Sequence, residues 1–228
     1  MNTSSTHLVA LVGGSGAGKG WLASRLCSCL GGDAAHLSLD HFYRDRTDLT
    51  AAEREALDFD APAAVDWDDL VGVLGTLRAG RPAEVPRYDF SSHRRSPSPS
   101  PLLPRPVVFV EGLWLLQPPA VRAMFDLTLY LDASEEIRIS RRLQRDVAER
   151  GRSPAEVAAR MRRDVLPWHA RQVEPQRDWA DLVLSQPFAP PEIDLLADAL
   201  HGLLARPGTT EAAPEAFRTE LRATLLTA

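Results

Sequence analysis

The sequence predicts an α/β fold in which a doubly wound parallel sheet is covered by helices on both faces. Short apolar segments alternate along the chain with segments whose apolar residues recur at helical spacing. Several of the apolar segments are continuous, which is typical of strands buried on both faces. A glycine-rich turn at residues 13–20 joins the first of these strands to the first helix, as in nucleotide-binding sheets.

The predicted strands share apolar runs that are bounded by charged residues, glycine or proline. They cover residues 8–12, 35–39, 84–90, 106–112, 125–131 and 181–184. Residues 96–106 contain five prolines and are therefore expected to form a surface excursion or an edge, not an interior strand or a helix.

Helix starts are marked by capping residues. Thr50–Glu53 and Ser153–Glu156 have the capping-box pattern, and Asp66 and Ser134 are expected to cap two further helices. The helix after Asp66 should bury one face and end at Gly80. That face consists of Trp67, Leu70, Val71, Leu74 and Leu77. The face of a closing amphipathic helix consists of Ile193, Leu196, Leu200, Leu203 and Leu204.

Composition indicates an ordinary globular domain and argues against a nucleic-acid binder. The chain has 228 residues, 44% hydrophobic and 25% charged, with a formal net charge of −5. Cys27 and Cys29 lie two apart on the predicted first helix and therefore point in different directions, which argues against a metal pair or a disulfide. We expect both to be packing residues. No apolar run approaches the roughly 18 residues of a membrane span, and the N-terminus lacks a signal pattern. We therefore expect a cytoplasmic protein with no membrane partner.

The turn at residues 13–20 reads as a P-loop. It consists of Gly13, Gly14, Ser15, Gly16, Ala17, Gly18, Lys19 and Gly20. Lys19 is the one lysine in a chain with 26 basic residues, so the rest are arginines. Backbone amides of such a loop bind nucleotide phosphates, and its lysine reaches the β- and γ-phosphates. Position 20 departs from the pattern, because a Ser or Thr hydroxyl there normally holds Mg²⁺ and Trp21 cannot replace it. The metal would then be held through water or other side chains.

Two carboxylates follow predicted strands at the edge where the P-loop lies. Asp40 ends the strand at 35–39 and Glu111 ends the strand at 106–112. A phosphoryl-transfer site needs a carboxylate for Mg²⁺ and a base near the acceptor hydroxyl. Asp40 and Glu111 are the candidates for these two roles, although a strand-end carboxylate can also be a turn residue.

Residues 138–163 carry nine arginines and three acidic residues, and we interpret this segment as a lid. Several of the arginines share one helical face, namely Arg138, Arg141, Arg142 and Arg145. Gly151 between Arg150 and Arg152 permits a hinge. A lid of this kind would close arginines over a triphosphate, whereas the alternative is an exposed helix with ion pairs.

Several motifs in this order resemble the uridine kinase family, within the phosphoribulokinase and uridine kinase group of P-loop kinases. The resemblance extends from about Leu8 to Leu184. Besides the P-loop, the motifs are Leu39–Tyr43, Asp58–Pro62, Val85–His93, Phe109–Gly112 and Arg141–Arg152.

The resemblance implies transfer of phosphate from ATP or GTP, with Mg²⁺, to the 5′-hydroxyl of uridine or cytidine in pyrimidine salvage. It implies that Asp40 takes or orients the hydroxyl proton, that Glu111 helps to hold Mg²⁺, and that Asp60 and Arg142 fix the ribose hydroxyls. The residues implied to line the pyrimidine are Tyr43, Tyr88 and His93. The residues implied to clamp phosphates, together with Lys19 and the loop up to Trp21, are Arg145, Arg150 and Arg152.

Other positions depart from the family pattern besides Gly20. Asp60 is followed by Ala61 rather than a polar residue, Arg160 stands where relatives often have glutamine, and the proline-rich segment 96–106 replaces a hairpin strand. Two alternatives therefore remain open: a kinase of another small alcohol such as nicotinamide riboside or pantothenate, and a nucleotide-binding regulator without turnover. We expect residues 1–205 to form the kinase domain and 206–228 a tail, and a homo-oligomer stays open.

Overall fold

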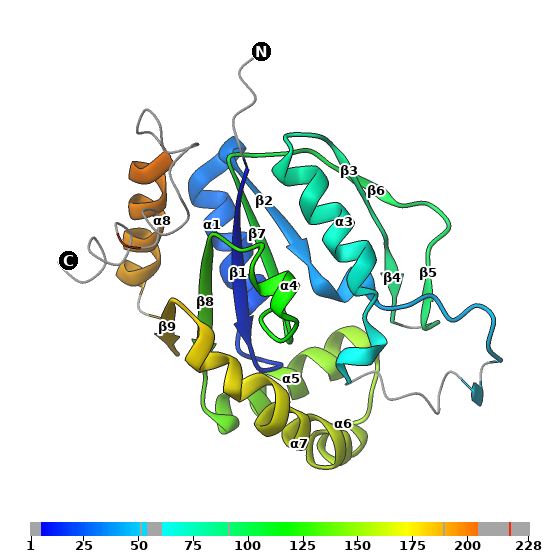
Figure 1. Cartoon of the computed structure of the whole chain (residues 1–228). Helices are drawn as coiled ribbons and strands as arrows, with labels where there is room; N and C mark the ends of the chain where they lie inside the picture. The colour runs from blue at the N-terminus through cyan, green and yellow to red at the C-terminus, as the bar shows by residue number, and fades with distance from the viewer. Residues whose placement is uncertain are drawn as a thin grey trace.

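The computed structural model confirms a five-stranded parallel sheet flanked by helices (Figure 1). It describes residues 6–50, 52–53, 61–90, 92–188, 190–204 and 219. The strand order is β2-β7-β1-β8-β9. The bounds are β1 His7–Gly13, β2 Ala34–Ser38, β7 Val107–Gly112, β8 Leu127–Asp132 and β9 Leu182–Ser185. Five of the six predicted strands therefore form this sheet.

The central strand β1 is buried along its whole length, as its apolar composition requires. It pairs in parallel with β7 on one side and with β8 on the other. On the far side of β7, Ser38 of β2 stands in register with Glu111. Because all five strands are parallel, their carboxyl ends meet at one edge of the sheet.

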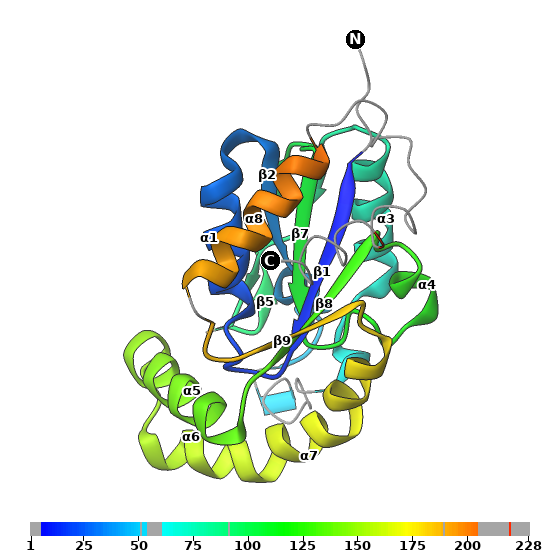
Figure 2. The same ribbon diagram turned by 90° about the vertical axis from the view of Figure 1, so that its left-hand side faces the viewer.

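Helices cover both faces of the sheet, and Figures 1 and 2 show the two layers. Helices α1 (Lys19–Leu30) and α8 (Pro190–Leu204) bury apolar side chains against one face, including Leu26 and Leu200. Helix α3 (Trp67–Arg78) packs on the other face beside the segment that contains α4 (Pro119–Arg122). Each amphipathic helix thus contributes one apolar stripe to one of two cores.

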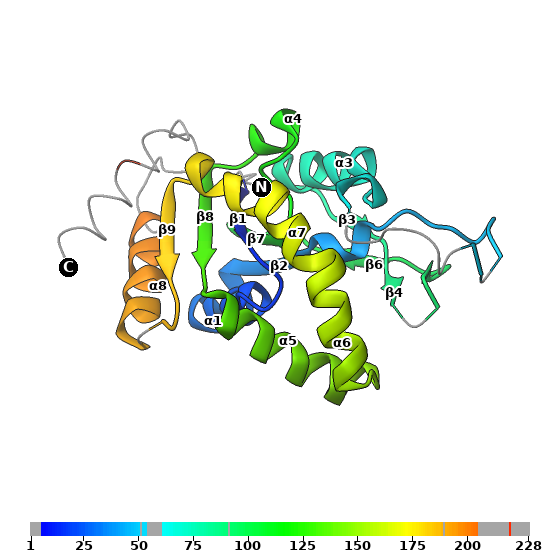
Figure 3. The ribbon, with the colours of Figure 1, turned by 90° about the horizontal axis from the view of Figure 1, so that it is seen from below.

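The predicted lid forms part of a helical excursion that lies across the carboxyl edge of the sheet (Figures 1 and 3). Helix α5 (Glu135–Arg150) ends at Gly151, whose left-handed φ of 63° turns the chain into α6 (Pro154–Arg160). Wide π-helical turns, Met161–Val165 and His169–Val173, flank the short helix α7 (Leu166–Trp168) and lead back to the sheet.

The predicted helix caps are confirmed. Ser134 accepts a hydrogen bond from the Ile137 amide, and Ser153 forms a reciprocal capping box with Glu156. Thr50 and Glu53 make the same reciprocal bonds, although the residues after Glu53 lie outside the described part of the chain. Asp66 accepts a bond from the Asp69 amide at the start of α3.

The predicted strand at 84–90 is divided between two small hairpins. Strand β3 (Ala83–Val85) pairs with β6 (Ser100–Leu102), while β4 (Tyr88–Asp89) pairs with β5 (Arg94–Arg95). The idea that segment 96–106 replaces a hairpin strand is therefore wrong, because residues 100–102 form one. Proline is tolerated there because both strands of a two-stranded sheet are edges.

Two local predictions are also wrong. Val71 is 37% exposed, and Val73 takes its place on the buried face of α3. Cys29 is exposed, whereas Cys27 is partly buried against the core below α1. In the tail predicted at 206–228, only Thr219 is described. Among the helices that the structure describes, none is long and apolar enough to cross a membrane.

Candidate active site

A cavity of about 450 Å³ opens at the carboxyl edge of the sheet, between the P-loop, the ends of β2 and β7, and the lid. It brings together most of the residues that the sequence singled out. Those that line it are Ser15, Gly16, Gly18, Lys19, Gly20, Trp21, Asp40, Tyr43, His93, Glu111, Arg142, Arg145 and Arg152. In doubly wound sheets this edge is where ligands bind.

The P-loop has the shape of a phosphate cradle. Gly16 and Gly18 have φ angles of 84° and 86°, a left-handed conformation that glycine adopts without strain. Lys19 opens α1 and its Nζ donates to the carbonyls of Gly13 (2.9 Å) and Gly14 (3.1 Å). Burial lowers the pKa of Lys19, and the nearby Glu111 and Asp40 partly oppose that shift. Lys19 therefore lies at the amino end of α1, where the helix dipole and the free backbone amides favour bound phosphate.

The two carboxylates are connected through Ser38, which sequence reasoning missed. The Ser38 hydroxyl donates to Glu111 Oε1, and it accepts a 3.3 Å bond from the Asp40 amide. The parallel register of β2 and β7 creates this arrangement by placing Ser38 opposite Glu111. In the sequence, the polar side chain of Ser38 two positions before Asp40 was a weak signal for this connection.

These oxygens fit a magnesium ion. Mg²⁺ in phosphoryl-transfer sites is commonly bound by one or two carboxylates plus water and substrate phosphates. Asp40 and Glu111 line the same cavity as Lys19 and can supply those carboxylates. A Cβ added at Gly20 would meet no described atom outside its own stretch of helix within 4 Å, so a small side chain could be placed there. The described residues contain no cluster of three His, Cys, Asp or Glu side chains that could hold a metal without such help.

The lid directs arginines into the cavity from three of its elements. Arg141, Arg142 and Arg145 come from α5, Arg152 from the turn before α6, and Arg160 from the end of α6. The Arg142 guanidinium donates from Nη1 to the Ser15 hydroxyl of the P-loop at 3.0 Å. The Arg150 side chain lies outside the described residues.

Arg138 lies behind the P-loop instead of lining the cavity. It is 4% exposed, and its Nε donates to the Ala133 carbonyl at 3.2 Å. A Cβ at Gly14 would stand 2.8 Å from Arg138 Nη1 and 2.9 Å from Nδ1 of His169, so both side chains touch the loop. Burial lowers the pKa of His169 to about 4, with help from the positive charges of Arg138 and Lys19. His169 was not predicted, and no motif marks it.

An aromatic cluster contributes to the wall of the same cavity. Tyr43, Phe90 and His93 line it, whereas Tyr88 is 8% exposed and packs behind them. The rings of Tyr43 and Tyr88 lie 5.1 Å apart, and the Tyr88 hydroxyl is 3.4 Å from Nδ1 of His93. Phe90 meets both tyrosines edge-on and was not predicted. Asp60 lies outside the described residues.

The hairpin that carries His93 is anchored by Arg95. This side chain donates from Nε to the Tyr43 carbonyl and from Nη1 to Asp69 of α3, both at 2.8 Å. The contacts tie the short strands β4 and β5 to the main domain. Arg95 therefore links the hairpin of His93 to Tyr43 and to α3.

A second hollow of about 350 Å³ adjoins the P-loop beside Gly18. Trp21 and Phe188 form one wall, with ring centroids 6.3 Å apart and planes inclined by 12°. Arg141 and Gln186 also line this hollow, and Arg141 Nη1 donates to Gln186 Oε1 at 3.1 Å. Flat aromatic surface next to a phosphate cradle offers a stacking platform for a nucleobase.

Comparisons with known proteins agree with this geometry. A model of the Phosphoribulokinase / Uridine kinase family matches residues 8–188. The uridine kinase of Staphylococcus epidermidis is 35% identical over 203 residues, which are 88% of this chain and 98% of the relative. The uridine kinase of Limosilactobacillus reuteri is 34% identical over 206 residues, 90% and 94% of the two chains.

A solved structure shares the fold. Phosphoribulokinase from Rhodobacter spheroides superposes with a TM-score of 0.58 over 80% of this chain and 70% of its own, at 16% identity. The family match spans the sheet, the P-loop, both carboxylates and the arginines of the lid. The chain therefore belongs to the phosphoribulokinase and uridine kinase family.

Proposed function

We propose that this protein is an ATP-dependent kinase that phosphorylates the 5′-hydroxyl of uridine or cytidine. The observation that carries the proposal is the single cavity in which Lys19, Asp40, Glu111, the lid arginines and the aromatic cluster meet. The P-loop and arginines suit a triphosphate, and the aromatic cluster suits a planar acceptor base. Two relatives at 34–35% identity over most of their length are uridine kinases.

In the proposed reaction the acceptor oxygen attacks the γ-phosphorus of ATP. The new O–P bond forms as the bond from the γ-phosphorus to the β–γ bridging oxygen breaks, and ADP leaves. Asp40 accepts the proton of the acceptor hydroxyl. Lys19 and Arg145 stabilise the negative charge on the phosphoryl group in transit.

Asp40 and Glu111 would hold magnesium, which neutralises phosphate charge when bound. Asp60 and Arg142 would hold the ribose diol, and Tyr43 and His93 would contact the base. Arg152 and Arg150 would bind donor phosphates.

We expect the purine base of ATP to bind in the hollow beside Gly18. Trp21 is 58% exposed, although tryptophan is highly buried on average, so much of its side chain is open to a ligand. Its ring stacks on Phe188 and also borders the main cavity. A purine lying against this wall would leave its triphosphate beside Gly18 and the rest of the P-loop.

The alternatives differ in acceptor or in turnover. Arg160 lines the cavity at a position where relatives often have glutamine. This difference favours, as the alternative acceptor, another small alcohol such as nicotinamide riboside or pantothenate. Gly20 motivates the regulator without turnover, which would bind ATP but transfer phosphate to no acceptor.

The experiment that tests the function is ADP release from Mg²⁺-ATP with uridine, cytidine, adenosine, nicotinamide riboside and pantothenate in turn. Lys19→Met serves as the blank. We expect turnover with uridine or cytidine alone. Turnover with only another acceptor would refute the pyrimidine assignment, and bound ATP without any turnover would favour the regulator.

Asp40→Asn tests the assigned base. We expect ATP affinity close to that of the wild type and turnover lower by about two orders of magnitude or more, the scale of a positioned general base. Turnover near that of the wild type would remove Asp40 from the mechanism.

A further inference from the structure

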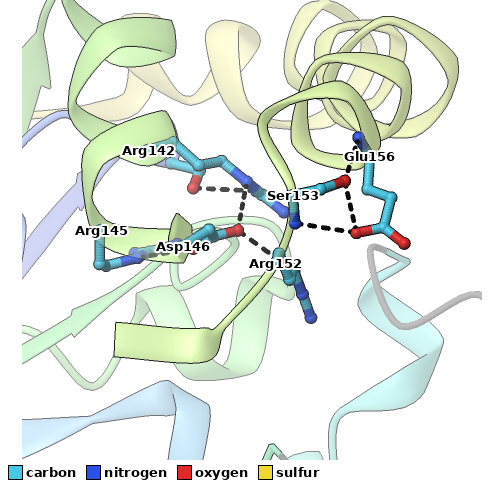
Figure 4. Close-up of polar contacts among 7 residues, drawn as sticks. Arg142, Arg145, Asp146, Arg152, Ser153 and Glu156 are labelled. Atoms are coloured by element: carbon cyan, nitrogen blue, oxygen red, sulfur yellow. Dashed lines mark hydrogen bonds and ion pairs between the residues drawn. The ribbon is translucent and has the colours of Figure 1, made fainter. Parts of the chain in front are cut away.

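Asp146 is a fully buried carboxylate inside the lid, and three arginines that line the cavity contact it (Figure 4). Its Oδ1 accepts bonds from Arg145 Nε (3.0 Å) and Nη2 (2.9 Å). Its Oδ2 accepts a 3.1 Å bond from Arg152 Nη1 and lies 3.5 Å from Arg142 Nε. We name Arg142, Arg145 and Arg152 the arginine cluster.

The side chains of the arginine cluster come from two parts of the lid, on either side of the turn at Gly151. Arg142 and Arg145 belong to α5, whereas Arg152 follows the glycine turn that ends this helix. The Arg152 amide also donates to the Asp146 carbonyl at 3.1 Å, which closes that turn. Through Arg142, whose Nη1 donates to Ser15, the contacts of Asp146 extend to the P-loop. One carboxylate therefore connects α5, the start of α6 and the phosphate cradle.

The charges explain why a carboxylate is needed there. Three guanidinium groups converging on one wall of a cavity repel one another, and without an anion each would turn toward solvent. One carboxylate stabilises their convergence but cannot neutralise three guanidinium groups. The arginine cluster thus keeps a net positive charge on the side facing the cavity, where phosphates are expected.

We propose that Asp146 is a positioning residue that assembles the phosphate-binding arginines of the lid before the nucleotide binds. The proposal rests on the proposed function for the identity of the nucleotide. Preassembly matters because arginine side chains are long and flexible, and ordering them on binding weakens affinity. With Asp146 in place, Arg145 and Arg152 are already ordered when ATP arrives.

The contacts predict which substrate is affected most. Arg145 and Arg152 make the short bonds to Asp146, whereas Arg142 is more distant and has a separate anchor in Ser15. Loss of the carboxylate should therefore disturb Arg145 and Arg152 most, which are the arginines assigned to the donor phosphates. The affinity for ATP should fall much more than that for the acceptor.

The test is the variant Asp146→Asn, which keeps the size of the side chain and removes its charge. ATP binding is measured by isothermal titration calorimetry, and both KM values by ADP release. We expect ATP to bind about 30-fold more weakly, the scale of ordering two arginine side chains. The nucleoside KM should change by less than about threefold. Unchanged ATP affinity, or tighter binding by released arginines, would overturn the proposal.

Asp126→Asn is the matched control. Asp126 is also a buried carboxylate, paired with Arg78 at 2.7 Å and accepting the Leu8 amide at 2.8 Å, but it lies at the amino end of β8, opposite the cavity. It should lower the free energy of unfolding in urea without changing ATP affinity. A fall in ATP affinity in this control equal to that of Asp146→Asn would show that Asp146 acts only through stability.

A second variant covers the case in which Asp146→Asn does not fold. Asp146→Glu keeps the charge, and its ATP affinity per folded molecule should stay within about threefold of that of the wild type. A 30-fold loss there, with the control unaffected, would overturn the proposal. Calorimetry measures ATP binding without an acceptor. If the wild type binds ATP but turns over no acceptor, the proposed kinase function is refuted, while the ATP affinities of the Asp146 variants and the control still test the role of Asp146.

Discussion

Replacing Gly16 by alanine tests how closely the lid supports the P-loop. Gly16 has a φ of 84°, and a residue with a Cβ in that conformation costs roughly 1–2 kcal/mol. The added Cβ would also stand 2.4 Å from the carbonyl oxygen of Arg138 and 2.9 Å from its Cα. These atoms belong to the backbone of α5, so the loop or the helix must move, at a cost of about 1–3 kcal/mol.

Together the two effects oppose the present loop conformation by about 2–5 kcal/mol. We expect ATP affinity, measured by calorimetry, to fall by about 30-fold or more, since 1.4 kcal/mol is a factor of ten. Gly20→Ala is the matched control, because its Cβ would meet no described atom within 4 Å. That variant should raise the free energy of unfolding by up to about 1 kcal/mol through helix propensity. Wild-type ATP affinity in Gly16→Ala would refute the reasoning.

Three further predictions concern the metal, the acceptor and pH. Gly20→Ser should lower the Mg²⁺ concentration for half-maximal ADP release about fivefold, because the serine hydroxyl would replace one metal-bound water, a gain of about 1 kcal/mol. An unchanged Mg²⁺ concentration for half-maximal release would contradict this. Arg142→Ala should raise the nucleoside KM more than the ATP KM, and the reverse order would assign Arg142 to the phosphates. His169, with its pKa lowered to about 4, stays neutral in the folded state while the unfolded chain takes up a proton below about pH 6.5. The contribution of neutral His169 to the free energy of unfolding is therefore fully present above pH 6.5 and is lost as the pH falls toward 4. Urea unfolding at pH 7 and pH 5 gives the free energy of unfolding for the wild type and for His169→Gln. Between these pH values the wild type should lose about 1 kcal/mol more of this free energy than the variant, a figure discounted for the partial exposure of His169. Equal losses would show that His169 does not cause the pH dependence.

Predictions from local chemistry were mostly confirmed. A strand buried on both faces must be apolar along its length, so β1 and β7 could be recognised from composition. The caps at Ser134 and Ser153 depend on hydrogen bonds within four residues, and both were found in the expected places.

Predictions that depended on distant partners were less accurate. The stretch 84–90 reads as one strand, but its two halves pair with different segments and therefore belong to different hairpins. Val71 and Val73 both fit an amphipathic pattern, and only the position of α3 on the sheet decides which one is buried.

The same distinction applies to the candidate site. The P-loop, Asp40, Glu111 and the arginine lid could be named from the sequence, because glycines, strand ends and charge density are properties of short segments. Ser38, Phe90 and the grouping of arginines around Asp146 could not be found in this way. Ser38 meets Glu111 through the register of two parallel strands that are far apart in the chain.

The sequence by itself determined the alternation of strands and helices, the phosphate loop with its one lysine, and the excess of arginine in the lid. Only the tertiary structure decided which arginines converge on Asp146, which aromatic rings line the cavity, and which carboxylates share it. The physical reason is that local conformation follows from neighbouring residues. The distance between two side chains, in contrast, depends on sheet register and helix packing, which sum many contacts between distant parts of the chain.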